Sequence, residues 1–294
     1  MDIKGKIIRA YRYVRYGVPV IEKKVVFAQI TNLSPNELLK GRIALVTGGS
    51  SGIGREIARA FINAGSIVII TGRSMSRLVD ASKKIVNDED FKYKLFLYEL
   101  DSSNIEQVNN CIPNILDKFN LPKIDILVNN AGINRGAEGC NMEENFDAII
   151  NTNLKGTFFV AKKFADYFKS NKIEGNILNI ASSSSNRPAT DAYTLSKWGV
   201  KGLTKGLARV YSKYGIVVNA IAPGPTATPM IKRNDFDQEL TSEKNLTGRI
   251  AHPIEIANMA VILVSYISRT VIGDVVYMSN GSGNVYNEDV TYRF

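Results

Sequence analysis

The feature that most constrains this chain is an alternation of short β-branched segments with longer amphipathic segments, beginning at residue 42. The expected strands, each apolar on both faces, cover residues 42–47, 66–71, 94–100, 123–129, 175–181, 215–221 and 274–278. The expected helices cover residues 53–64, 75–87, 104–119, 142–169, 192–213 and 253–267. Strands of this kind are typical of a parallel sheet that helices cover on both sides. The sequence therefore predicts an α/β fold: a single doubly wound (Rossmann-like) domain with a seven-stranded parallel sheet and a binding crevice at the carboxyl ends of its strands.

A glycine-rich segment, TGGSSGIG (47–54), follows the first expected strand and leads into the first expected helix. Its glycines allow a tight turn and a close approach of the backbone to a pyrophosphate, which the N–H groups of the helix N-terminus can bind. The strand–turn–helix context favours a dinucleotide site over a glycine turn without a ligand. The predicted cofactor-binding residues in this segment are Gly48, Ser50, Ser51, Gly52, Ile53, Gly54 and Arg55.

The end of the second expected strand, TGRS (71–74), bears on the choice of dinucleotide. NAD-binding folds of this type carry an acidic residue here, which binds the ribose 2′-hydroxyl. Gly72 stands at that position, and Arg73 follows it. A guanidinium can bind a 2′-phosphate through several N–H groups, whereas a carboxylate would repel it. We therefore expect NADP(H) rather than NAD(H), with Arg55 as a second candidate clamp; the alternative is that Arg73 is an ordinary exposed loop residue.

Two residues four positions apart, Tyr193 and Lys197, lie in a segment that is predicted to be helical, so they share one face. A free phenol has a pKa of about 10, and a nearby ammonium lowers it toward the range that suits general acid–base catalysis. Ser182 ends an expected strand at the crevice, where its hydroxyl can donate to a substrate carbonyl oxygen. The serines at 183–185 follow directly, and one of them could be the donor instead.

Several motifs occur together in a defined order: TGGSSGIG (47–54), NNAG (129–132), NTNLKG (151–156), NIAS (179–182), YTLSK (193–197) and NAIAPGPTATPM (219–230). Over residues 42–281 the chain resembles the short-chain dehydrogenase/reductase family. The resemblance implies a catalytic tetrad of Asn153, Ser182, Tyr193 and Lys197, in which Asn153 holds a water that links Lys197 to solvent; a helix kink is the alternative role for Asn153. It also implies further cofactor contacts: Asp101 at the adenine, Asn129, Ala131 and Gly132 at the ribose, Tyr193 and Lys197, and Pro223, Gly224, Thr226 and Thr228 at the nicotinamide.

The expected function is hydride transfer between NADP(H) and a carbonyl or alcohol. Within that class, we expect a ketone reductase. NNAGINRG (129–136) and NTNLKGTFF (151–159) are similar to 3-oxoacyl-carrier-protein reductases, whereas RPATDAYTLSKWG (187–199) is similar to general carbonyl reductases, so the small-molecule substrate stays open. Alternatives are a sugar, polyol or steroid dehydrogenase of the same fold, or a non-catalytic dinucleotide-binding scaffold, against which the intact tetrad argues. The resemblance also implies a homodimer or homotetramer that pairs through helices 142–169 and 192–213.

Substrate choice is expected to lie in the walls formed by residues 133–142, 183–192 and 229–250. The third segment is long and of mixed charge, which is typical of a mobile lid. Met230, Phe236 and Leu240 are its candidate apolar lining. The alternative is a solvated loop that never contacts substrate.

Residues 1–40 lie outside the alternation and form a basic, partly helical extension, which precedes the domain at 41–294. The extension holds eight Lys or Arg and three Asp or Glu, so it carries +5 of the chain's net charge of +9. An apolar stripe at Ile3, Ile7, Tyr11 and Val14 predicts an amphipathic helix that docks on an acidic carrier protein or an anionic surface. The alternative is that it packs on its own domain or on a neighbouring subunit.

Other classes of function are disfavoured. The two cysteines of the sequence, at 111 and 140, argue against a disulfide framework and fit a reducing, cytoplasmic setting. No run approaches 18 apolar residues, and no secretory signal is evident. The lone histidine, His252, precedes Pro253 and is interpreted as a structural loop residue, so we expect no metal site. No G-x-S-x-G elbow or nucleic-acid motif appears, so hydrolysis and nucleic-acid binding are not expected.

Overall fold

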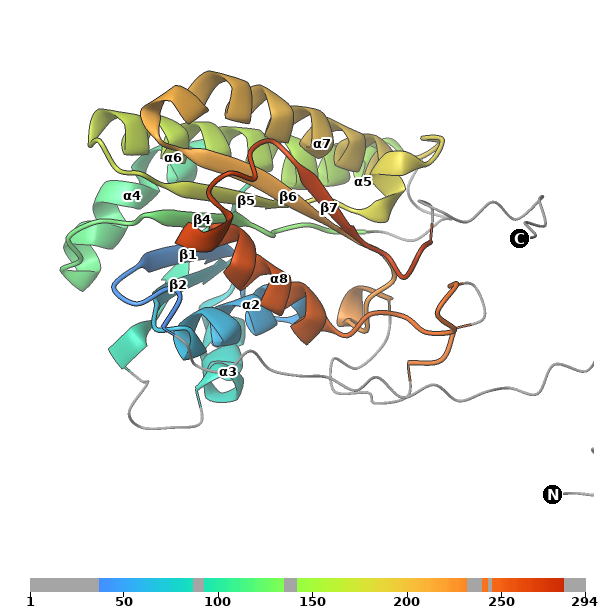
Figure 1. Ribbon diagram of the computed structural model, residues 1–294, viewed down its shortest axis with the longest axis horizontal. Coiled ribbons are helices and arrows are strands. Elements are labelled where there is room, and N and C mark those ends of the chain that lie inside the picture. Colours follow the sequence, from blue (N-terminus) through green and yellow to red (C-terminus); the bar gives the residue numbers. More distant parts are fainter. Residues whose placement is uncertain (1–36, 87–92, 135–141, 232–239, 243–244, 283–294) are drawn as a thin grey trace, which may run out of the picture.

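The computed structural model describes residues 37–86, 93–134, 142–231, 240–242 and 245–282. They form one parallel sheet of seven strands in the order β3-β2-β1-β4-β5-β6-β7 (Figure 1). The strands are β1 Ile43–Thr47, β2 Ile67–Gly72, β3 Leu95–Glu99, β4 Ile126–Asn129, β5 Asn176–Ile180, β6 Val217–Pro223 and β7 Val275–Met278. The order reverses between β1 and β4, which is the switch point where such sheets open a crevice. The predicted fold class is confirmed.

Helices cover both faces of the sheet (Figure 1). One face carries α2 (Gly52–Asn63), α3 (Met75–Ile85) and α8 (Pro253–Val264), and the other carries α4 (Ile105–Phe119), α6 (Thr157–Ser170) and α7 (Ala192–Tyr211). Successive residues of a strand pack against the two helix layers in turn. Val46 and Ile70 pack toward α2 and α8, whereas Leu45 and Ile69 pack toward α4 and α6. This is why the strands are apolar on both faces.

The expected continuous helix over 142–169 is wrong in one respect. The structure divides it into α5 (Glu143–Ile150), a π-helical turn η2 (Asn151–Gly156) and α6. A Cβ on Gly156 would lie 2.6 Å from the backbone oxygen of Ser102, so the turn passes close to the loop after β3. Wide turns of this kind often mark functional positions. Here the turn holds Asn153.

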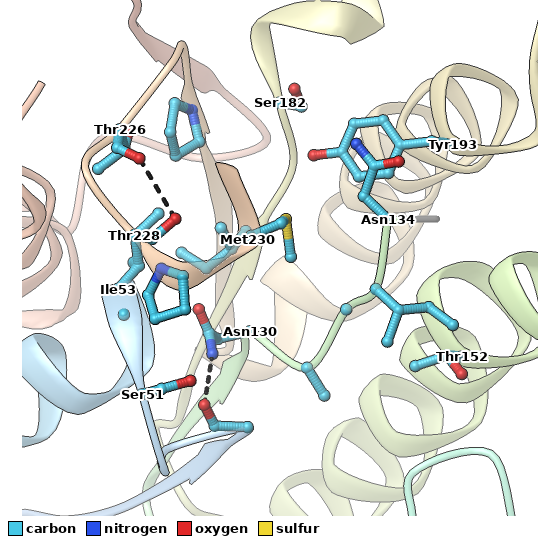
Figure 2. Close-up of a pocket in the computed structure, with 18 of the residues that line it drawn as sticks. Ser51, Ile53, Asn130, Asn134, Thr152, Ser182, Tyr193, Thr226, Thr228 and Met230 are labelled. Carbon is cyan, nitrogen blue, oxygen red and sulfur yellow. Dashed lines mark hydrogen bonds between the residues drawn. The ribbon is translucent and has the colours of Figure 1, made fainter. Parts of the chain in front are cut away.

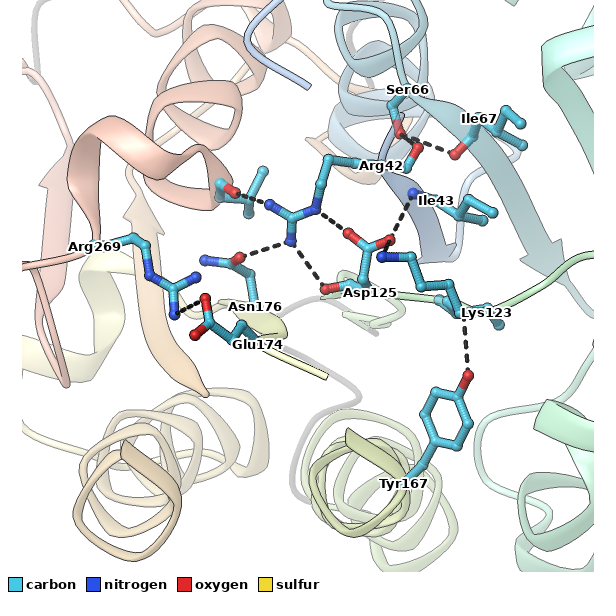
Figure 3. Close-up of polar contacts among 12 residues, drawn as sticks. Arg42, Ile43, Ser66, Ile67, Lys123, Asp125, Tyr167, Glu174, Asn176 and Arg269 are labelled. Carbon is cyan, nitrogen blue, oxygen red and sulfur yellow. Dashed lines mark hydrogen bonds and ion pairs between the residues drawn. The ribbon is translucent and has the colours of Figure 1, made fainter. Parts of the chain in front are cut away.

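The opposite end of the sheet, away from the crevice, holds a buried ion pair between Arg42 and Asp125 (Figure 3). Arg42 is 5% exposed and Asp125 is 1% exposed. The guanidinium also donates to the side-chain oxygen of Asn176 at 2.9 Å, and Asp125 accepts from the backbone N–H of Ile43 at 3.1 Å. Buried charges need such partners. The cluster therefore joins the amino ends of β1, β4 and β5.

The shorter elements and the ends of the chain complete the description. Two 3₁₀ turns border the crevice, η3 (Ser183–Asn186) and η5 (Pro229–Ile231), and two others, η4 (Ser212–Tyr214) and η6 (Tyr266–Ser268), follow helices. The predicted amphipathic helix near the N-terminus lies outside the described residues, so its docking role stays a prediction. None of the helices in the described ranges has the length and apolarity to cross a membrane.

Candidate active site

A cavity of about 580 Å³ opens at the carboxyl ends of the strands and is lined by the loops that follow β1 to β6 (Figure 2). Most of the residues predicted from sequence line it. They are Gly48, Ser50, Ser51, Gly52, Ile53, Arg73, Asp101, Ala131, Gly132, Ser182, Tyr193, Lys197, Pro223, Gly224, Thr226 and Thr228. Four predicted residues do not line it: Gly54, Arg55, Asn129 and Asn153.

The glycine-rich turn after β1 forms one end of the cavity. Gly48 and Gly52 have φ angles of +64° and +54°, which residues with a Cβ rarely adopt. The Ser51 side chain makes no capping hydrogen bond to α2, and the first turn of α2 holds no acidic residue. The positive end of the α2 dipole is therefore directed at the cavity without a neutralising carboxylate of its own.

Gly54 serves packing rather than the cavity wall. A Cβ there would lie 2.3 Å from the amide nitrogen of Asn130 and 2.5 Å from the backbone oxygen of Gly48. That amide donates to the backbone oxygens of Thr47 at 2.9 Å and Gly48 at 3.0 Å, and Figure 2 draws one of these bonds. Asn130 thus fastens β4 to the glycine turn and lines the cavity. Sequence reasoning selected its neighbour Asn129, which is buried and donates to Asn179 at 2.9 Å instead.

The arginines on the cavity wall are not the two that were expected. Arg55 is 3% exposed and pairs with Glu56 at 3.2 Å, so it is not placed on the cavity wall as a clamp. Arg73 does line the cavity, and Arg77 of α3, which the sequence reasoning missed, lines it as well. Both are exposed. The signal for Arg77 is its position in the first turn of α3, the helix that begins directly after Arg73 and Ser74.

Tyr193 and Lys197 lie at the other end of the cavity, in the first two turns of α7. Asp191 caps this helix by accepting from the backbone N–H of Thr194 at 2.8 Å, which fixes the start of α7. The Tyr193 hydroxyl points into the cavity (Figure 2). Lys197 is 6% exposed, donates to the backbone oxygen of Ile180 at 2.9 Å, and has its Nζ 5.6 Å from the centroid of the Tyr193 ring.

The electrostatics of this pair differ from the expectation. Burial raises the pKa of Tyr193 above its ordinary value of 10.0; a hydrogen bond from Ser182 acts in the opposite direction, and the charge of Asp191 raises the pKa further. The expected lowering of this pKa by Lys197 is therefore wrong for the structure as it stands. Burial instead lowers the pKa of Lys197 from 10.5 to about 8. The phenol is protonated at neutral pH, and the lysine is close to titration.

Among the four consecutive serines, Ser182 is the one whose position fits the expected hydrogen-bond donor. It follows β5, lines the cavity and hydrogen-bonds the phenol of Tyr193. Ser183 and Ser184 also line the cavity. Ser185 does not: it is fully buried, and its hydroxyl donates to the backbone oxygen of Ser182 at 2.7 Å.

Asn153 lies behind the cavity wall. Its side chain accepts from the backbone N–H of Ile133 at 2.8 Å, donates to the backbone oxygen of Ile133 at 2.9 Å, and donates to Ser196 at 3.3 Å. These contacts join η2 to the segment after β4 and to α7. They position the wall beside Lys197, and the role of Asn153 in holding a water stays a prediction.

The predicted lid is described in part. Met230 lines the cavity and is 47% exposed, as expected for an apolar lining residue. Leu240 does not line it, because it is fully buried in a separate cluster with Ala227 and Ile250. Phe236 lies outside the described residues.

Two further expectations were that the chain has no metal site and that His252 has a structural role. Within the described ranges, no group of three or more His, Cys, Asp or Glu could hold a metal ion. His252 caps α8: its Nδ1 accepts from the backbone N–H of Ile254 at 3.2 Å, and Glu255 accepts in return from the backbone N–H of His252 at 2.8 Å. The interpretation of His252 as structural is consistent with this capping box.

Comparison with known proteins agrees with this geometry. A family model described as short chain dehydrogenase matches residues 42–239. A 3-oxoacyl-[acyl-carrier-protein] reductase of Rickettsia bellii is 36% identical over 247 residues, which cover 83% of this chain and 97% of that protein. A gluconate 5-dehydrogenase of Gluconobacter oxydans is 34% identical over 252 residues, covering 83% and 95%. The crystal structure of an actinorhodin polyketide ketoreductase with NADPH is 28% identical with a TM-score of 0.73, covering 83% and 97%. The chain belongs to the short-chain dehydrogenase/reductase family of oxidoreductases, which bind a nicotinamide dinucleotide.

Proposed function

We propose that this chain is an NADP(H)-dependent oxidoreductase that transfers a hydride between the nicotinamide and a carbonyl or alcohol, and that it acts as a ketone reductase. The observation that carries the proposal is one cavity with a glycine turn at one end and Ser182, Tyr193 and Lys197 at the other. The dinucleotide, when bound, supplies or accepts the hydride. The side chains of the cavity bind it, orient the substrate and move the proton.

The glycine end of the cavity fits the phosphates of a dinucleotide. The turn has no Cβ at Gly48 and Gly52, so the backbone can approach a ligand closely. The N-terminus of α2 opens onto the same space without an acidic residue in its first turn. Backbone N–H groups and the helix dipole favour an anion there. Asn130 holds the turn in place through its two bonds to the backbone of β1 and the turn.

Two arginines favour NADP(H) over NAD(H). Arg73 and Arg77 line the end of the cavity next to Gly72, where a residue that binds a 2′-hydroxyl would carry a carboxylate. The neighbouring acid on the wall, Asp101, accepts from the backbone N–H and the hydroxyl of Ser103 at 2.9 and 2.7 Å. Two guanidinium groups can bind a 2′-phosphate through several N–H donors. The relative solved with NADPH supports the same choice.

The other end of the cavity supplies a proton donor. In reduction, the Tyr193 hydroxyl would donate its proton to the carbonyl oxygen while Ser182 donates a hydrogen bond to the same oxygen. The raised pKa of Tyr193 keeps the phenol protonated at neutral pH, which is the form that donates a proton in the reduction step. Lys197 would bind the ribose of the cofactor and stabilise the phenolate after proton transfer. Asn153 would position this wall and pass the replacement proton through a bound water.

The substrate class is left at carbonyl compounds and alcohols. Relatives are described as acting on 3-oxoacyl groups and on gluconate, so a sugar or polyol dehydrogenase is the second candidate. The catalytic end of the cavity is intact, and this argues against a non-catalytic scaffold. We further propose a homodimer or homotetramer that pairs through α5–α7, where Phe158, Leu195 and Trp198 are 42%, 44% and 41% exposed.

The decisive experiment is a panel of ketones and alcohols, each assayed with NADPH and with NADH. We expect ketone reduction with a preference for NADPH. Replacing either Arg73 or Arg77 with alanine should raise KM for NADPH about 10- to 100-fold, since one lost charged hydrogen bond contributes about 1.5–3 kcal/mol, and should leave KM for NADH nearly unchanged. Lys83→Gln is the matched control, because Lys83 lies on α3 but is 71% exposed and does not line the cavity. A preference for NADH in the unmodified enzyme contradicts the cofactor assignment.

A further inference from the structure

The substrate end of the cavity carries a third arginine, Arg187, which the proposed reaction does not use. Arg187 directly follows η3, the turn that begins after Ser182. It lines the same cavity as Ser182 and Tyr193. Its backbone oxygen accepts from the indole N–H of Trp198 at 2.8 Å, and Trp198 is the residue after Lys197. The backbone of Arg187 is therefore held against α7, the helix that carries Tyr193 and Lys197.

Among the described residues, the guanidinium of Arg187 makes one hydrogen bond. One Nη donates to the hydroxyl of Ser282 at 2.5 Å, which ties the loop after β5 to the turn after β7. A guanidinium carries five N–H donors in a planar fork that matches a carboxylate or a phosphate. In the ranges that the structure covers, no carboxylate is paired with it. The acid nearest in sequence, Asp191, is occupied by the backbone N–H and the hydroxyl of Thr194 at 2.8 and 2.9 Å.

The charge of the cavity wall is uneven. Asp101, the acidic residue among those that line it, comes from the loop after β3, at the end assigned above to the adenine. The substrate end has Lys197 and Arg187 and no acidic lining residue among the described ones. Ile133 belongs to the same apolar cluster as Tyr193, and Met230 lines the cavity. An anion with a short aliphatic chain matches this combination of a fixed cation and apolar walls.

We propose that Arg187 selects the substrate by binding its carboxylate, so that the preferred substrate is an oxo acid and the product is the corresponding hydroxy acid. This rests on the proposed ketone reductase function. The ketone oxygen faces Ser182 and Tyr193, the carbon chain packs on Ile133 and Met230, and the carboxylate binds the guanidinium of Arg187. Reduction adds the hydride to the carbonyl carbon and the proton to its oxygen, and the carboxylate is unchanged.

The test compares charged and neutral forms of the same ketones. 3-Oxobutanoate, 4-oxopentanoate and 5-oxohexanoate are assayed beside their methyl esters in unmodified enzyme and in Arg187→Gln, Arg187→Lys and Lys83→Gln. We expect Arg187→Gln to lower kcat/KM for the best acid about 10- to 100-fold, mainly through KM, and to change the ester less than about twofold. Arg187→Lys should recover much of the loss, and Lys83→Gln should behave as the unmodified enzyme. At saturating NADPH, added salt should lower kcat/KM for the acid and leave kcat/KM for its ester unchanged.

A second readout does not depend on turnover. Trp198 is the one tryptophan of the sequence, and its indole is bonded to the backbone of Arg187, so its fluorescence reports on this loop. Titration with each acid, with and without NADP⁺, should give a saturable change that the ester and Arg187→Gln lack. Dihydroxyacetone phosphate, a ketone that carries a phosphate in place of a carboxylate, is titrated in the same way. Tighter binding of this ketone than of every oxo acid would overturn the carboxylate assignment.

Two failures are distinguishable. If no ketone is reduced with either nucleotide, the proposed function is wrong, and the fluorescence titration alone decides the role of Arg187. If neutral ketones are reduced but Arg187→Gln lowers the acid and its ester equally, or neither, with no acid-specific fluorescence change, the reductase stands and the role of Arg187 is refuted.

Discussion

Replacing Lys197 with methionine should stabilise the folded chain while it abolishes turnover. The side chain is 6% exposed, and burial lowers the pKa of its ammonium from 10.5 to about 8. At neutral pH the folded chain therefore holds a charge in a place that disfavours it. Methionine has nearly the same length and no charge, so it fills the space without that cost.

The magnitude follows from the pKa. One pKa unit corresponds to about 1.4 kcal/mol, so the charged lysine costs about 3 kcal/mol at pH 7. The lost hydrogen bond from the charged ammonium to the backbone oxygen of Ile180 subtracts about 1.5–2 kcal/mol, which leaves a net gain of about 1–1.5 kcal/mol. Between pH 8 and 10.5 the unfolded chain still binds a proton that folded Lys197 has released, so the unmodified protein gains stability as pH rises. The advantage of Lys197→Met should therefore fall to near zero at pH 10.

The assay is urea unfolding of both proteins at pH 7 and pH 10, at one protein concentration so that association contributes equally. Ketone reduction is measured in parallel. Lys83→Met is the control, because Lys83 is 71% exposed and should change the free energy of unfolding by less than about 0.5 kcal/mol at both pH values. A variant that is less stable than the unmodified protein at pH 7, or whose gain is the same at pH 10, refutes the reasoning.

Three further predictions concern other parts of the structure. Tyr193→Phe removes the proposed proton donor and should lower kcat at least about 100-fold while NADPH still binds in a fluorescence titration; full activity would exclude this donor. Gly54→Ala forces a Cβ to 2.3 Å from the amide of Asn130, so the free energy of unfolding should fall about 1–3 kcal/mol and NADPH should bind more weakly; unchanged affinity would mean that the turn tolerates the shift. Asp125→Leu leaves Arg42 buried without its partner and should cost about 3–5 kcal/mol in urea unfolding with turnover kept, whereas the double change with Arg42→Met should recover most of it; equal losses in both would contradict the ion-pair argument.

The sequence alone determined the fold class and much of the cavity wall. Both rest on short-range regularities: strands that are apolar on both faces, glycines placed between a strand and a helix, and residues one helical turn apart. Sixteen of the predicted site residues line one cavity for this reason. Tyr193 and Lys197 could be paired because a helix fixes which residues share a face.

The tertiary structure decided what depends on neighbours distant in sequence. Burial sets the direction of the pKa of Tyr193 against the expectation, because desolvation acts through everything packed around the phenol and not through Lys197 alone. Glu56 and the packing of α2 remove Arg55 from the cavity wall, and the path of α3 brings Arg77 to it. The chain between Ser182 and Tyr193 places Arg187 on the cavity wall, where Trp198 and Ser282 from two other parts of the chain hold it. No local pattern contains such contacts, since they form only when separate elements pack together.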